Sequence, residues 1–89
     1  MNNTRNTWDQ VLSHIKENVT PISFDTFLKP LNLHSIDEDV KIAYIESKDD
    51  FIISVIKNRY IPLIEGSFHT LFGDDYRVVI KNADEYKTV

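Results

Sequence analysis

Histidines and paired aspartates are the residues of this 89-residue chain whose types suit catalysis or metal binding. The histidines stand far apart, as His14, His34 and His69. They form no H-x-x-x-H or H-E-x-x-H pattern that would place two ligands on one helix face. Asp49-Asp50 and Asp74-Asp75 fall in predicted caps or turns, where aspartate is common for backbone reasons. We therefore expect no catalytic residue, no metal site and no enzyme.

Other chemical motifs are absent from the sequence. The chain has no cysteine, which excludes a disulfide scaffold, a thiol nucleophile and a cysteine-ligated zinc site. The only glycines, Gly66 and Gly73, form no phosphate-binding loop, so no cofactor is expected. No run approaches the roughly 20 apolar residues that span a bilayer. The polar start MNNTRNT is followed by no hydrophobic region, and we expect a cytoplasmic protein without membrane contact.

Composition fits one small globular domain with an acidic balance. Hydrophobic residues make up 42% of the chain, and the formal net charge is −4. Nucleic-acid binding depends on lysine and arginine displacing counterions, so an acidic domain starts at a disadvantage. A local strip of Lys48, Lys57 and Arg59 is flanked by aspartates. We expect weak nucleic-acid binding or none.

Two helices are predicted in the first third of the chain. The first, over 7–18, is predicted by apolar residues at helical spacing: Trp8, Val11, Leu12, Ile15 and Val19. Thr7 and Gln10 have the spacing of a capping box, and His14 faces away from the apolar stripe, towards solvent. The second helix lies in PISFDTFLKPLNL, with Ser23 as its N-cap and Pro30 at its end.

The second helix is too short to be stable without tertiary packing. Its apolar residues share a face and are expected to pack inward: Phe24, Phe27 and Leu28. The outer side, with Ser23 and Thr26, is then left for contact with a partner.

Alternating apolar residues predict three strands. Leu31–Ile36 and Val40–Ile45 form a hairpin around the acidic turn 37–39, with a slip of phase near Ser35. The third strand covers 76–81. The predicted order is α-α-β-β-α-β, an α+β fold of one domain over 1–81, with a three-stranded sheet carrying helices on one face. Residues 82–89 are read as a polar tail or the start of a linker.

Between the second and third strands, a long helix is predicted over about 50–72. Asp49 or Asp50 caps it, and Pro62 kinks or breaks it. Phe51 lies about half a turn from the centre of the apolar stripe, and Val55 leans to the same side. Either another element covers this pair, or it is exposed for protein contact.

Three stretches in a fixed order carry a family likeness. They are TWDQVLSHIK with Trp8, the block SFDTFLKPL, and the F-x8-Y-x3-I pattern of Phe51, Tyr60 and Ile64. Together they make residues 7–81 resemble the amino-terminal domain of the bacterial chromosomal replication initiator DnaA. The fold of that family has the same α-α-β-β-α-β order and is similar to a KH domain of the second type.

The resemblance implies a protein-interaction domain that self-associates weakly and docks the replicative helicase and regulators of initiation. Trp8 matches the family's self-association surface, and Phe51 and Ser23 match its helicase- and regulator-binding surface. With their neighbours, the predicted partner-binding residues are Ser23, Thr26, Asp49, Asp50, Phe51 and Val55.

The sequence departs from the family at several points. Phe27 stands where the family usually has tryptophan, and Ser23 stands where some members are acidic. Ser47-Lys48-Asp49-Asp50 replaces the family's Pro-Asn. The glycine loop with which KH domains clamp nucleic acid is absent.

Two alternatives remain open from the sequence. One is a KH-like module that binds single-stranded nucleic acid through Lys48, Lys57, Arg59 and exposed aromatic residues. The other is a free-standing adaptor that copies the initiator domain and competes for its partners.

Overall fold

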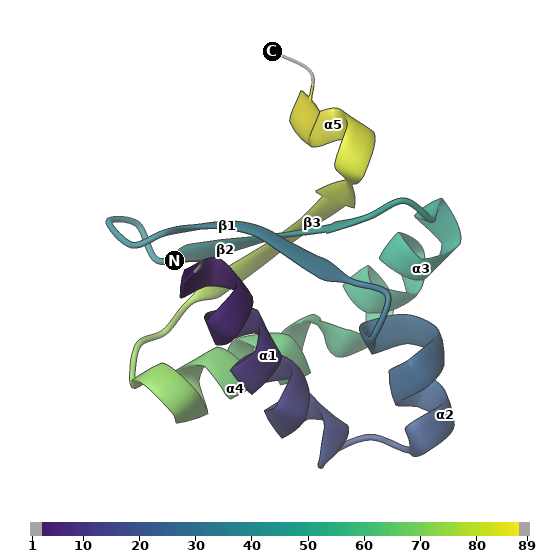
Figure 1. Cartoon of the computed structure of the whole chain (residues 1–89), viewed down its shortest axis with the longest axis horizontal. Helices are drawn as coiled ribbons and strands as arrows, with labels where there is room; N and C mark the ends of the chain where they lie inside the picture. Colours follow the sequence, from purple (N-terminus) through teal and green to yellow (C-terminus); the bar gives the residue numbers. More distant parts are fainter. Residues whose placement is uncertain (1–2, 88–89) are drawn as a thin grey trace.

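The computed structural model describes residues 3–87 as a three-stranded sheet with helices packed mainly on one face (Figure 1). The elements follow in the order α1 (Asn3–Lys16), α2 (Pro21–Ser23), η1 (Phe24–Leu28), β1 (Asn32–Asp37), β2 (Ile42–Ser47), α3 (Asp50–Val55), η2 (Ile56–Tyr60), α4 (Ile61–Phe72), β3 (Arg77–Asn82) and α5 (Ala83–Lys87). The segments η1 and η2 are π-helical. Strand β2 pairs antiparallel with β1 and parallel with β3. The predicted α+β class, order and sheet are confirmed, and α5 is an addition.

The core lies between the sheet and the helices α1 to α4. Alternate residues of β2, Ala43, Ile45 and Ser47, are buried, whereas Tyr44 and Glu46 face the other side of the sheet. The fully buried large side chains come from both layers: Phe68, Ile15, Leu28, Leu31, Ile45, Ile56, Ile64 and Val11. A single core therefore holds both layers together.

Helix α1 begins earlier than the sequence predicts. The expected span was 7–18, but the described helix runs over Asn3–Lys16. Thr7 consequently lies inside the helix and is not its N-cap, so the capping-box spacing to Gln10 misled the prediction of the start. At the other end, Asn18 donates from its side-chain amide to the carbonyl of His14 at 2.8 Å, which satisfies an end carbonyl.

Both prolines that follow helical stretches stand directly after a π-type hydrogen bond. The amide of Lys29 donates to the carbonyl of Phe24 at 2.8 Å, and the next residue is Pro30. The amide of Ile61 donates to the carbonyl of Ile56, just before Pro62. A proline ring clashes with the carbonyl four residues earlier, and a wider turn relieves that crowding. The predicted interruption at Pro62 is thus a π-helical segment that joins α3 to α4.

The hairpin contains the irregularity that the slip of phase predicted. The register between β1 and β2 shifts between Leu33 and Ser35, which places His34 at the bulge. The connecting turn is closed by Asp37, whose Oδ1 accepts from the amides of Asp39 at 3.0 Å and Val40 at 3.3 Å. Such side-chain acceptors stabilise tight turns.

Residues 83–87 are helical, which the prediction of a polar tail over 82–89 missed. Ala83 is buried, and the Tyr86 hydroxyl donates to the carbonyl of Ile45 at 2.9 Å. The Tyr86 ring also meets Tyr44 edge-on, on the side of the sheet opposite α1 to α4. Residues 88 and 89 lie outside the described residues, and the start of a linker there stays a prediction. Within 3–87, no helix is long and apolar enough to cross a membrane.

The buried indole of Trp8 fastens α1 to the start of β1. Only 5% of Trp8 is exposed, and its Nε1–H donates to the carbonyl of Leu31 at 3.1 Å. We expect Trp8→Phe to lower the free energy of unfolding by about 1–3 kcal/mol, because it leaves a buried acceptor without its donor. Urea unfolding measures the change, with Asp9→Asn as the exposed neighbouring control. A Trp8→Phe midpoint equal to that of the unaltered chain would contradict this role.

Stability at alkaline pH tests the contact between α5 and the sheet. Burial, and secondly Glu46, raise the pKa of the Tyr86 phenol from 10.0 to about 12. A raised folded pKa favours the protonated phenol, so the stabilisation is complete below pH 10 and is lost between about pH 10 and 12. We expect the chain to lose stability over this window more steeply than Tyr86→Phe in parallel urea titrations. Equal slopes would show that Tyr86 ionises as freely in the folded as in the unfolded state.

Candidate protein-interaction surface

An exposed aromatic residue on α3 rests on one partly buried aromatic residue, which in turn packs on another. Phe51 is 68% exposed, and its ring centroid lies 6.5 Å from that of Phe27 in η1. Phe27 in turn lies 6.2 Å from the ring of Tyr60 in η2. Aromatic pairs at these separations are attractive beyond simple burial. Phe27 thus packs against one side of the Phe51 ring, and most of that ring stays exposed to solvent.

The start of α3 holds Phe51 in place. Asp49 is the N-cap, with an extended backbone, and its Oδ1 accepts from the amides of Phe51 at 2.8 Å and Ile52 at 3.3 Å. Ile53 is buried and anchors the same turn in the core. Phe51, two positions before Ile53, therefore turns away from the core. The expectation that Asp49 or Asp50 caps this helix is confirmed for Asp49.

The remaining residues predicted beside Phe51 differ in accessibility. Asp50 is exposed, and its Oδ1 accepts from Asn82 Nδ2 at 3.0 Å. Val55 is half-buried, so only part of its side chain is available. We call Phe27, Asp49, Asp50, Phe51 and Val55 the Phe51 surface.

Ser23 and Thr26 lie on the helical segment that carries Phe27. Thr26 is exposed and Ser23 half-buried. Ser23 is not the N-cap that the sequence predicted, because the helix begins at Pro21 and Thr20 Oγ1 accepts from the Ser23 amide at 3.2 Å. Proline suits the first helical position, where its missing N–H leaves no bond unmade. The aromatic residues divide as well, since Phe24 is buried while Phe27 is only half-buried.

Ile22 is an exposed apolar residue that the sequence reasoning missed. It lies on α2 and is 80% exposed, more than Phe51. Its position in the sequence indicated this exposure. Ile22 stands two positions before Phe24, so on a helix it lies off the face that Phe24 turns to the core. Large exposed apolar side chains on one small domain suit contact with another protein.

A hollow of about 450 Å³ opens beside the Phe51 surface. Its lining mixes three apolar residues, Pro30, Ile52 and Ala83, with polar and charged residues that include Lys48 and Asp49. Such a mixture of apolar and charged residues is typical of the edge of a protein-binding patch.

Trp8 does not belong to this exposed set. Its side chain lies in the core, although its edge lines a shallow groove with Leu12 and Leu33. Its role in self-association stays a prediction. Because Trp8 is buried, a second copy would mainly contact the half-buried residues around it.

The histidines lie in three separate polar contacts. His14 Nδ1 is 2.8 Å from Ser67 Oγ, because α4 packs beside α1, so it is half-buried rather than in solvent. His34 pairs with Glu46 at 3.5 Å and His69 with Asp75 at 2.9 Å. Within residues 3–87, no group of three metal-ligating side chains comes together.

Solved structures and curated sequences show what the chain resembles. A crystal structure of a HobA–DnaA (domain I–II) complex from Helicobacter pylori contains a chain with the same fold, at a TM-score of 0.76 and 18% identity. The match covers 88% of this chain and 99% of that chain.

Two curated relatives are chromosomal replication initiator proteins DnaA. The protein from Geotalea uraniireducens is 28% identical over 83% of this chain and 16% of its own length. That from Aliarcobacter butzleri is 29% identical over 92% of this chain and 19% of its own length. The chain thus spans less than a fifth of these relatives. The family model of the DnaA N-terminal domain matches residues 5–70, which include most of α1, the Phe51 surface and most of α4. The chain belongs to the family of DnaA N-terminal domains.

Proposed function

We propose that this domain is a non-catalytic, cytoplasmic docking module of a replication initiator that binds the replicative helicase and regulators of initiation. The single observation that carries the proposal is the exposed Phe51 ring on a fixed helical frame. Membership of the family and the HobA–DnaA complex formed by a relative of the same fold support a protein partner.

The Phe51 surface has the make-up of a binding hot spot. An aromatic side chain that is already held in one orientation loses little conformational entropy on binding. Burying such a ring against a partner removes apolar area from water, which favours association. Phe27, itself packed on Tyr60, supports the ring, and we expect Phe51 to bind without rearrangement.

Charge around Phe51 indicates the kind of surface that a partner presents. Asp49 and Asp50 are exposed beside it, with only Lys48 as a neighbouring cation in the sequence. Complementary potentials steer association and select partners. We infer that the helicase or regulator places a basic rim around an apolar pocket for Phe51, with Ser23, Thr26 and Val55 at the margin of the contact.

Weak self-association is assigned to the neighbourhood of Trp8. The groove along its edge combines the half-buried Leu12 and Leu33 with charged groups that include Asp9 and Lys29. Two copies of this small, mixed groove would bury limited apolar area, which fits a weak dimer.

Replacing Phe51 tests the docking role directly. Because the ring is mainly exposed, we expect Phe51→Ala to leave the melting temperature within about 2 °C of the unaltered chain. We expect the same variant to weaken binding to the replicative helicase of the same organism by tenfold or more, as measured by isothermal titration calorimetry.

Val40 provides the matched control, since it is 58% exposed at the hairpin turn and outside the Phe51 surface. Val40→Ala is expected to bind the helicase as the unaltered chain does. Full helicase affinity in Phe51→Ala would overturn the docking role, and a melting temperature lowered by several degrees would assign Phe51 to the core.

Titration with single-stranded DNA separates protein docking from the KH-like alternative. With a net charge of −4, we expect no measurable binding in low salt by fluorescence anisotropy of a labelled oligonucleotide. Measurable affinity that falls steeply as salt rises, and that is lost in Lys57→Ala, would favour nucleic-acid binding instead.

A further inference from the structure

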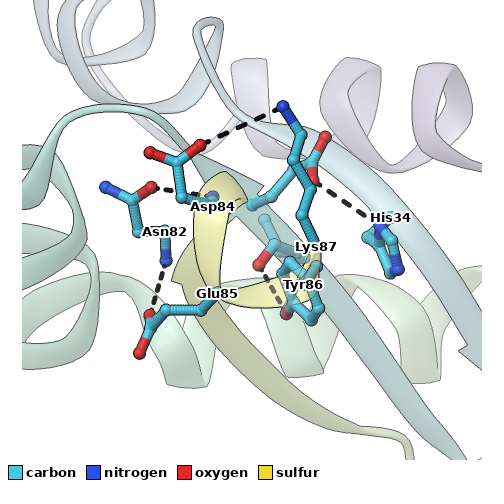
Figure 2. Close-up of polar contacts among 8 residues, drawn as sticks. His34, Asn82, Asp84, Glu85, Tyr86 and Lys87 are labelled. Carbon is cyan, nitrogen blue, oxygen red and sulfur yellow. Dashed lines mark hydrogen bonds and ion pairs between the residues drawn. The ribbon is translucent and has the colours of Figure 1, made fainter. Parts of the chain in front are cut away.

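Helix α5 begins with a reciprocal cap at the end of β3. Asn82 Oδ1 accepts from the amide of Asp84 at 2.9 Å, and Glu85 Oε2 accepts from the amide of Asn82 at 3.0 Å (Figure 2). This arrangement is a capping box, which satisfies amides at the start of a helix. A helix of five residues has little stability of its own, so α5 depends on this cap and on its contacts with the sheet.

Those contacts hold α5 against the outer side of the sheet, which is the face opposite α1 to α4. The Tyr86 ring stacks on His34 with centroids 4.2 Å apart and planes 11° apart, and its hydroxyl donates to the Ile45 carbonyl (Figure 2). His34 is in turn paired with Glu46 of β2. Tyr86 therefore links α5 to both strands of the hairpin, and Ala83 is buried at the base of α5.

The same capping residue also reaches the Phe51 surface. Asn82 Nδ2 donates to Asp50 Oδ1 at 3.0 Å, which joins the first turn of α3 to the start of α5. Strand β3 and α3 are packed together as well. Phe51 follows Asp50 directly, so the hydrogen bond acts one residue from the exposed ring. The family model, which matches residues 5–70, includes Asp50 but ends before Asn82.

We propose that Asn82 is a positioning residue and that α5 is a brace which, through Asp50, holds the first turn of α3 and Phe51 in the orientation used for docking. The docking part of this inference rests on the proposed function, whereas the brace itself does not. The surface that binds a partner then depends on residues 82–87, which run from the last residue of β3 through α5.

Asn82→Ser tests the hydrogen bond between Asn82 and Asp50, which we call the bridge, while it keeps the cap of α5. Serine is a good N-cap and keeps an acceptor for the Asp84 amide, but its hydroxyl is one bond closer to the backbone than Asn82 Nδ2 and falls short of Asp50 Oδ1. Lys87→Ala is the matched control, because it removes the Lys87–Asp84 pair at 4.0 Å within α5 and leaves the bridge intact. Asp50→Ala is the reciprocal variant, which breaks the same bond and leaves Asn82 unchanged.

Amide hydrogen exchange followed by NMR measures the brace without a partner. We expect the Ile53 amide, which donates to the Asp49 carbonyl at 3.1 Å, to exchange about two- to fivefold faster in Asn82→Ser and in Asp50→Ala. Lys87→Ala should exchange at the original rate. Unchanged exchange in both bridge variants would overturn the brace.

Calorimetric binding to the replicative helicase tests the docking part. We expect Asn82→Ser to weaken binding about fivefold while Lys87→Ala binds normally. Faster exchange with full helicase affinity, in a domain whose Phe51→Ala variant fails to bind, would overturn the positioning role. If Phe51→Ala binds normally, the proposed function fails, and the exchange rates still decide whether the brace exists.

Discussion

Burial of Phe24 and Leu28 is the packing contact on which the interaction surface depends. The segment α2–η1 is only eight residues long, from Pro21 to Leu28, and forms because these two side chains enter the core. Their burial leaves Phe27 at the edge of the core, in reach of Phe51. Without that support, Phe51 would be a free side chain on the first turn of a helix. The core thus determines how the exposed aromatic residue is presented.

Proline positions shape both helical segments that meet at this surface. Pro30 and Pro62 each follow a residue whose amide closes a π-type bond, so η1 and η2 are widened just before them. Phe27 lies in η1 and Tyr60 in η2, and their rings are in contact. A wider turn changes the direction of side chains relative to a regular α-helix. The two π-helical segments therefore carry Phe27, which contacts Phe51, and Tyr60, which packs on Phe27.

Local patterns in the sequence predicted most of the fold, and long-range contacts account for what they missed. The alternation and the stripe of apolar residues identified three strands and the long helix, including the bulge near Ser35 and the cap at Asp49. At the site, the helical position of Phe51 indicated that it faces away from the core. It could not show whether another element covers the ring, because that depends on how η1 packs against α3. Asn82 and Glu85 had the spacing of a capping box for α5, yet the anchor of that helix joins residues 41 positions apart. The hydrogen bond of the buried Trp8 could not be predicted from local patterns either, because its acceptor, Leu31, lies 23 positions away.

The most direct test of the account is a map of the partner contact on the domain in solution. Isotope-labelled domain would be titrated with the unlabelled replicative helicase, and changes in backbone amide signals would be followed by NMR. We predict changes that centre on Phe51, Asp49 and Asp50 and extend to Thr26, with the hairpin turn at Val40 unaffected. Changes centred on the outer side of the sheet or on α1, with the Phe51 signals unmoved, would contradict the assignment of the docking surface.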